Sequence, residues 1–282
     1  MGKGKGDDPR FQCDQDRSAE QPVEGNRPRR YALKSLMTGV LAAMITTAST
    51  LAAPAAEKSV SIVLVHGAFV DASGWQAVYD ILSADGYEVL AVQNPTVTLQ
   101  GDVEATRQVI AKADKPVVLV GHSYGGAVIT EAGGLPKVQS LVYLAAFAPE
   151  AGESVFDIAT APTPGEDKAP LLEPTDGFLL VDSEKFPTAF AADVDPAKTR
   201  FMADAQVPWG LGAVQAKITA PAWKEKPIYF MVTRKDHMIP PSQQRSMAAR
   251  AGAKVLEIDS SHAVMLSHPQ DVADFIAGAA AK

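Results

Sequence analysis

A serine flanked by glycines is the feature of this chain that most suggests chemistry. It lies in Gly121-His122-Ser123-Tyr124-Gly125, directly after the apolar run PVVLV and directly before a stretch of helical composition. A strand that turns this tightly into a helix imposes strained backbone angles on the serine, which small flanking residues tolerate. The serine oxygen would project above the sheet as a nucleophile, where the helix N-terminus favours an oxyanion. The alternative is a serine in an ordinary turn.

A serine hydroxyl is a weak nucleophile until a base takes its proton, so a histidine and a carboxylate are expected elsewhere. Asp236 follows the apolar run at 227–233 by three residues, and His262 follows the run at 253–258 by four. Both would lie at the carboxyl edge of a parallel sheet, where ligands gather. The chain order serine, acid, histidine fits a nucleophilic serine in a tight turn between a strand and a helix. We therefore predict Ser123 as nucleophile, His262 as general base and Asp236 as the acid that orients it.

Other residues could fill two of these roles. Asp259 is near His262 in the sequence, although a neighbour three residues away orients the ring poorly, and Asp157 follows the preceding strand. For the base, His237 adjoins the predicted acid, and His268 stands at the start of the last helix. These four remain open alternatives to Asp236 and His262.

The end of the first apolar run, LVHGAF, could supply part of an oxyanion hole. Gly67 permits a flexible turn there, and the backbone N–H of Ala68 could pair with that of Tyr124 to hold a tetrahedral oxyanion. The simpler interpretation is a glycine needed only for the turn. We expect His66 and His122 to have structural roles beneath these loops.

The elements that must position these residues alternate between strand and helix from Ser59 onward, which is typical of a parallel sheet covered by helices. Continuous apolar runs predict buried strands, at 60–65, 88–93, 116–120, 139–145, 227–233 and 253–258. Helices are expected between them at about 74–84, 102–113, 124–132, 241–251 and 269–280. The alternation of strands and helices is interrupted at about 148–222, a segment too long for a plain loop. We predict that it forms a helical cap, with helices at about 183–192 and 195–205. One domain, 57–282, would hold all of these elements.

Composition limits the possible partners. The chain has 282 residues, 46% of them hydrophobic and 21% charged, with a net charge of -7. This acidic balance disfavours nucleic acid and anionic membranes as partners. Cys13 is the single cysteine, so neither a disulfide framework nor a cysteine metal cluster can form within the chain. No cofactor is expected, and the oligomeric state stays open.

Residues 1–56 have the layout of a bacterial export signal. The basic segment RRYALK, which starts at Arg29, resembles a twin-arginine signal, and an uncharged apolar run follows at 36–53. Small residues in TLAAPAA would allow cleavage near 53–56. We therefore expect a periplasmic or secreted mature protein with no membrane contact. The alternative is an anchor that is not cleaved, because about 18 apolar residues approach the length that spans a bilayer.

Several motifs together resemble those of α/β-hydrolases of the serine esterase and methyl-esterase branch. They are LVHGAF followed by GW, VVLVGHSYGG, LVYLAAF, RKDHMIPP and SSHAVMLSHPQDVADFI, over about 60–147 and 224–280. The resemblance implies an α/β-hydrolase fold, a Ser-His-Asp triad, hydrolysis through an acyl-enzyme without a cofactor, and an acyl pocket under the cap. Ala263 stands where a hydroxynitrile lyase of this branch would carry lysine. Ser123 stands where a haloalkane dehalogenase or epoxide hydrolase would carry aspartate.

The function expected from these features is hydrolysis of a carboxylic ester of a small to medium, largely uncharged molecule. A related serine-triad activity (lactonase, thioesterase, perhydrolase or lyase) is the alternative, followed by a binding protein without catalysis. Aromatic residues of the cap could line the substrate pocket or form the cap's own core; they are Phe156, Phe186, Phe190, Phe201, Trp209 and Trp223.

Overall fold

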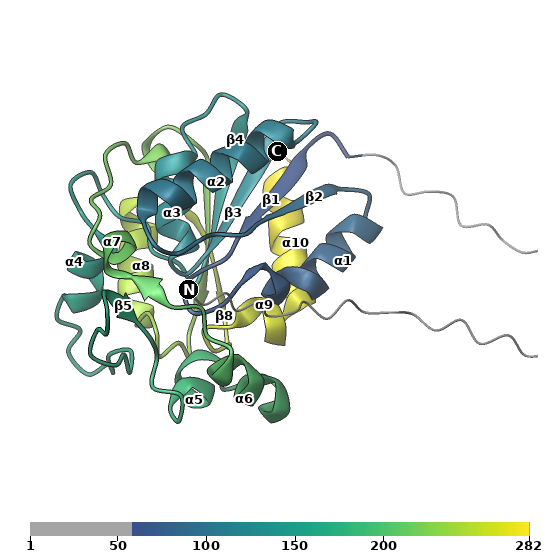
Figure 1. The fold of residues 1–282 in the computed structure, drawn as a ribbon. Coiled ribbons are helices and arrows are strands. Elements are labelled where there is room, and N and C mark those ends of the chain that lie inside the picture. The colour runs from purple at the N-terminus through teal and green to yellow at the C-terminus, as the bar shows by residue number, and fades with distance from the viewer. Residues whose placement is uncertain (1–57, 282) are drawn as a thin grey trace, which may run out of the picture. The chain divides into compact units, whose positions relative to one another are not determined.

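Six parallel strands form the centre of the computed structural model, which describes residues 58–281 (Figure 1). They lie in the order β2-β1-β3-β4-β7-β8. Their bounds are Ser61–Val65 (β1), Glu88–Val92 (β2), Val117–His122 (β3), Val138–Leu144 (β4), Ile228–Thr233 (β7) and Lys254–Ile258 (β8). The six predicted strands are confirmed, with ends that differ by at most two residues. Strands β1, β3 and β7 are buried along their whole length, which explains their continuous apolar runs.

Helices cover both faces of this sheet, as predicted. Alternate strand residues face opposite sides: Ile62 and Leu64 pack in the core that contains helices α1 and α10, whereas Val63 and Val65 pack in the core that contains α2, α3 and α8. The bounds are Gln76–Ala84 (α1), Leu99–Lys112 (α2), Gly125–Ala132 (α3), Pro241–Arg250 (α8) and Pro269–Ala280 (α10). Two short helices, Ala72–Trp75 (η1) and Val264–Ser267 (α9), were not predicted.

Helix α2 begins at Leu99, three residues before the start expected from the sequence. The hydroxyl of Thr98 accepts a hydrogen bond from the Gly101 amide at 3.2 Å and so caps the helix. Gly101 has a low helix propensity, which concealed this first turn in the sequence. As a result Asp102, which is buried, lies within the first turn of α2 and not at its start.

The cap segment between β4 and β7 contains the two expected helices and additional elements. Helices α5 (Phe186–Phe190) and α6 (Pro196–Asp204) fall within the predicted ranges. An antiparallel pair of two-residue strands, β5 (Phe178–Leu179) and β6 (Trp209–Gly210), was not predicted, because such short strands carry no alternating pattern. The remaining elements are Val155–Thr160 (α4), Leu211–Val214 (α7) and Ala222–Lys224 (η2).

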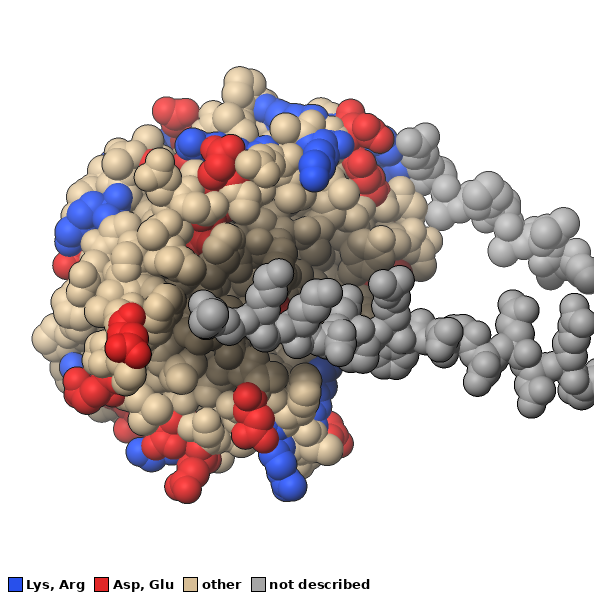
Figure 2. Space-filling view, in the orientation of Figure 1, with Lys and Arg blue, Asp and Glu red and all other residues tan. Residues whose placement is uncertain are grey.

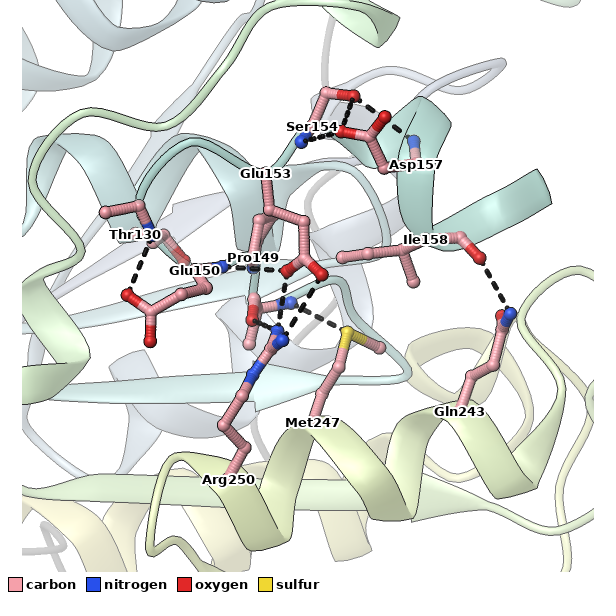
Figure 3. A network of polar contacts seen from close by, with 12 residues as sticks. Thr130, Pro149, Glu150, Glu153, Ser154, Asp157, Ile158, Gln243, Met247 and Arg250 are labelled. Carbon is pink, nitrogen blue, oxygen red and sulfur yellow. Dashed lines mark hydrogen bonds and ion pairs between the residues drawn. The ribbon is translucent and has the colours of Figure 1, made fainter. Parts of the chain in front are cut away.

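The chain that leaves β4 is bound to α8 by polar contacts (Figure 3). Arg250 donates to Glu153 at 2.8 Å, and the Gln243 side chain donates to the carbonyl of Ile158 at 2.7 Å. These contacts fix the start of the cap segment against the helix that follows Asp236.

The surface carries both signs of charge. On the face of Figure 2, lysine and arginine side chains alternate with aspartate and glutamate, and no large patch of one sign is visible. Among residues 58–281, no helix has the length and hydropathy needed to cross a membrane. The predicted export signal at 1–56 lies outside the described residues and stays a prediction.

Candidate active site

Ser123 and Tyr124 alone connect β3 to α3. Ser123 has a φ of 55°, in the left-handed region that is costly for a residue with a side chain. Hydrogen bonds hold it there: its N–H donates to the Leu144 carbonyl at 3.2 Å, and its carbonyl accepts from the amides of Gly126 at 3.0 Å and Phe147 at 3.1 Å. The strained turn expected from the sequence is therefore present, and it is fixed from the neighbouring strand.

The glycines predicted for these turns lie where the backbone approaches most closely. A Cβ on Gly121 would lie 2.6 Å from the carbonyl oxygen of Gly125, and one on Gly125 would lie 2.6 Å from that of Val65. A Cβ on Gly67 would lie 2.6 Å from the Cβ of Ser123. A larger residue at Gly67 or Gly125 would push the first strand's loop away from the serine turn, and one at Gly121 would clash with the start of α3.

The structure brings His262 and Asp236 together. His262 Nδ1 lies 2.8 Å from Asp236 Oδ2, and both side chains are buried. A carboxylate only accepts, so Nδ1 carries the proton of the neutral ring and Nε2 is left as the acceptor. Nε2 is buried and has no hydrogen-bond partner among the described residues. The hydrogen bond to Asp236 therefore fixes the tautomer of the imidazole and leaves Nε2 as an acceptor without a partner.

Asp236 is itself fixed in orientation by neighbours that the sequence did not reveal. Its Oδ1 accepts from the Met238 and Ile239 amides at 2.8 and 2.9 Å. Its Oδ2 accepts from Thr233 Oγ1 at 2.9 Å and from Gln244 Nε2 at 2.8 Å. No sequence motif marks Thr233 or Gln244, because their role depends on how α8 packs on β7.

His122 links the serine turn to the loop of His262. Its Nε2 donates to the His262 carbonyl at 2.9 Å, and the two ring centroids are 4.7 Å apart. Burial lowers the pKa of His122 well below its usual value, so the ring is neutral at neutral pH. The structural role expected of His122 thus places the candidate base against the turn that carries Ser123.

The two backbone amides predicted for an oxyanion hole each follow a carbonyl that is held by hydrogen bonds. The Gly67 carbonyl is bound by His66 Nδ1 at 2.8 Å, and the Ser123 carbonyl is bound by two amides, as described above. In a trans peptide the next N–H points the opposite way, so these bonds orient the amides of Ala68 and Tyr124. Within residues 58–281, neither amide has a hydrogen-bond acceptor. Both donors are therefore available.

His66 is locked by Asn94, a residue for which the sequence carried no signal. The Asn94 amide donates to His66 Nε2 at 2.8 Å, and Asn94 Nδ2 donates to the His66 carbonyl at 2.9 Å. Burial lowers the pKa of His66, so the ring stays neutral and Nδ1 keeps its proton for Gly67.

The alternative acids make other contacts. The Asp259 side chain is 58% exposed and pairs with Arg234 at 2.6 Å. Asp157 closes the capping box of α4 with Ser154 and pairs with Lys217. Neither forms a hydrogen bond with His262.

The alternative bases are also placed elsewhere. His237 is about half exposed and lies 3.9 Å from Asp167. His268 Nδ1 shares a hydrogen bond with Ser267 Oγ at 2.9 Å. Among the described residues, no hydrogen bond or ion pair joins either ring to Ser123.

The cap aromatics differ in their environment. Phe190 lies edge-on to His262, with 4.8 Å between ring centroids, and stacks on Phe186. Trp223 donates to the Pro149 carbonyl at 2.9 Å in the cap's interior. Phe156 and Phe201 are 45% and 71% exposed.

Among the described residues, no group of three or more His, Cys, Asp or Glu side chains could hold a metal ion. A histidine bonded to a carboxylate lies against His122, the residue before Ser123, and two backbone amides without acceptors lie in the adjoining loops. Within residues 58–281 the Ser123 hydroxyl forms no hydrogen bond with His262 Nε2. Acyl transfer through a serine uses groups of these types.

Known proteins resemble this chain in sequence and in fold. Residues 62–275 match the model of the alpha/beta hydrolase family. An alpha/beta hydrolase of Aspergillus novofumigatus is 28% identical over 242 residues, which cover 78% of this chain and 96% of that protein. A carbendazim-hydrolysing esterase of Nocardioides sp. is 35% identical over 123 residues, covering 39% and 51%. The crystal structure of a pyrethroid hydrolase from Sphingobium faniae has a similar fold, with a TM-score of 0.68, 24% identity and coverage of 79% and 98%.

Proposed function

Because this chain belongs to the alpha/beta hydrolase family, we propose that it is a serine esterase that works through an acyl-enzyme. The observation that carries the proposal is the hydrogen bond between His262 and Asp236, which leaves His262 Nε2 without a partner among the described residues. The His262 ring lies 4.7 Å, centroid to centroid, from that of His122, the residue before Ser123. An enzyme of this class with an esterase among its relatives fits hydrolysis of a carboxylic ester. A binding protein without catalysis would have no need of these three residues together.

In the first half of the reaction, Ser123 Oγ attacks the ester carbonyl carbon while His262 Nε2 takes the hydroxyl proton. The carbonyl oxygen becomes an oxyanion and accepts hydrogen bonds from the Ala68 and Tyr124 amides; one such donor contributes about a hundred- to thousandfold in rate. His262 then donates its proton to the departing alkoxide, and the C–O bond breaks. The acyl group remains on Ser123.

In the second half, water takes the place of the alcohol. His262 accepts a proton from water as its oxygen attacks the acyl carbon, and the proton returns to Ser123 as the acid leaves. Asp236 keeps the imidazole in the productive tautomer and stabilises its charged form. A lactone or thioester could react by the same steps, so those activities are alternatives that only substrates distinguish.

A small cavity beside the oxyanion loop would accommodate part of the substrate. It has a volume of about 120 Å³ and lies between the segment that follows Ala68 and one face of α6, lined by Phe69, Val70, Asp71, Ser73, Gly74, Lys198, Phe201, Met202, Ala205 and Leu266. Its surface is mostly apolar, with Asp71 and Lys198 as the charged lining residues, and neither Ser123 nor His262 lines it. A cavity of this size favours a small, uncharged acyl or alcohol group.

The expected substrate size can be tested with p-nitrophenyl esters of increasing acyl length. We expect the wild type to hydrolyse the acetate and butyrate readily. Ala205→Trp should fill the cavity, and we expect it to lower kcat/KM for the longest accepted ester by about tenfold or more, with acetate changed less than about threefold. The control is Ala197→Trp, in the first turn of α6 and not among the residues that line the cavity, whereas Ala205 directly follows the last residue of α6. Equal losses for every ester would contradict this location, and no hydrolysis of any ester would contradict the proposed function.

A further inference from the structure

Asp102 is a buried carboxylate that the proposed mechanism does not use. Its side chain has no exposed surface, and no ion pair among the described residues involves it. Burial raises its pKa. A buried carboxylate is costly unless hydrogen bonds satisfy it, so its partners indicate why it is there.

The first partner is the side chain of a proposed oxyanion donor. Tyr124 donates its hydroxyl to Asp102 Oδ2 at 2.6 Å. Burial raises the pKa of Tyr124 well above its usual value, so the hydroxyl keeps its proton at neutral pH. Tyr124 is thereby held at two points, through its backbone in the turn after Ser123 and through its ring on α2.

The second partner of Asp102 is Thr96, which is hydrogen-bonded to the cap segment. Asp102 Oδ1 accepts from the Thr96 amide at 2.8 Å, and Thr96 has a left-handed φ of 57°. The Thr96 hydroxyl donates to the Pro208 carbonyl at 3.0 Å, and the Thr96 carbonyl accepts from the Gly210 amide at 2.8 Å. Asp102 therefore also fixes the loop on which strand β6 rests.

Strand β6 in turn contacts both segments that supply the amides. The ring of Trp209 lies 5.2 Å from that of Tyr124 and 5.6 Å from that of Phe69, measured between centroids. The amide of Val207 donates to the Phe69 carbonyl at 3.2 Å. Phe69 follows Ala68 directly. The two oxyanion segments are thus connected through one buried cluster that Asp102 anchors.

We propose that Asp102 is a positioning residue of the oxyanion hole, acting through the Tyr124 hydroxyl. The inference rests on the proposed function, because it concerns the amide of Tyr124 as a donor to the oxyanion. Such donors act only when they are held within about 0.5 Å of the productive geometry. Loss of the ring's anchor would let the Tyr124 segment shift while substrate contacts elsewhere stay intact.

The test compares the kinetic effect of removing the hydroxyl from two tyrosines, each of which forms a buried hydrogen bond. Tyr124→Phe removes the hydroxyl bound to Asp102. Its matched control, Tyr143→Phe, removes a hydroxyl that lies 2.9 Å from Thr130 Oγ1 in another part of the core. With p-nitrophenyl acetate, we expect Tyr124→Phe to lower kcat about tenfold with KM within about twofold. We expect Tyr143→Phe to leave both constants within about twofold.

Asp102 variants complete the test. Asp102→Asn keeps an acceptor for Thr96 and a polar contact for Tyr124, so it should retain more of kcat than Asp102→Ala. The double variant Asp102→Ala/Tyr124→Phe should lose no more than the worse single variant, because both remove the same anchor. The inference is overturned if Tyr124→Phe loses no more kcat than Tyr143→Phe, or if the two losses multiply in the double variant. A different result would contradict the proposed function itself: ester hydrolysis that persists in Ser123→Ala.

Discussion

Ser123→Ala is expected to lower kcat for ester hydrolysis by about four to six orders of magnitude. Alanine removes the oxygen that would form the acyl-enzyme, and the buried imidazole has no other hydroxyl at the end of β3 to activate. The Ala68 and Tyr124 amides of the proposed oxyanion hole are not changed by this substitution, so substrate should still bind with a similar KM. Steady-state kinetics with p-nitrophenyl acetate, together with circular dichroism to show that the variant is folded, would measure this loss.

A second buried serine provides the control for this loss. Ser140 in β4 is buried, and its hydroxyl has no hydrogen-bond partner among the described residues. Ser140→Ala should therefore keep kcat within about twofold. A Ser123→Ala variant that keeps more than about one hundredth of the wild-type kcat would show that another group is the nucleophile.

Asp236→Asn is expected to lower kcat by about three to four orders of magnitude. An asparagine would present an N–H or a neutral oxygen to His262 Nδ1, so the ring could adopt the wrong tautomer and its charged form would lose a carboxylate. The Met238 and Ile239 amides can still donate to the Oδ1 of asparagine, which should preserve the turn. The measurement is kcat, with the midpoint of thermal unfolding to monitor the fold.

Asp259→Asn is the comparison that decides which residue is the acid. Asp259 is exposed and pairs with Arg234, so its loss should change kcat by less than about twofold. A larger loss from Asp259→Asn than from Asp236→Asn would overturn the assignment of the acid.

The sheet could be predicted well because its inner strands β1, β3 and β7 are buried on both faces. Runs such as VVLV in β3 read as continuous apolar segments, although β3 itself continues two residues past its predicted end, to His122. Once the strands are placed, residues just beyond their carboxyl ends must meet at one edge. This reasoning placed His262 and Asp236 near each other, although 26 residues separate them, and the structure joins them by a hydrogen bond.

The residues that support the site could not be predicted in the same way. Asn94 binds His66 across 28 positions, and Asp102 binds Tyr124 across 22. These partners meet only because of how a loop and a helix pack, and an asparagine or aspartate in such a segment looks like any surface residue. The burial of the cap aromatics could not be predicted either. Phe190 is buried against His262 and Phe201 is exposed, although the sequence marks both only as aromatic residues of the cap.

The most direct test of the central claim is covalent labelling with a fluorophosphonate, followed by peptide mass spectrometry. In the folded wild type we expect one adduct, on Ser123, because the proposed mechanism has His262 Nε2 activate its oxygen and has the Ala68 and Tyr124 amides bind the phosphoryl oxygen. The adduct should be absent from heat-unfolded protein and from Ser123→Ala. Folded wild-type protein that takes no label, or that carries it on another residue, would contradict the account.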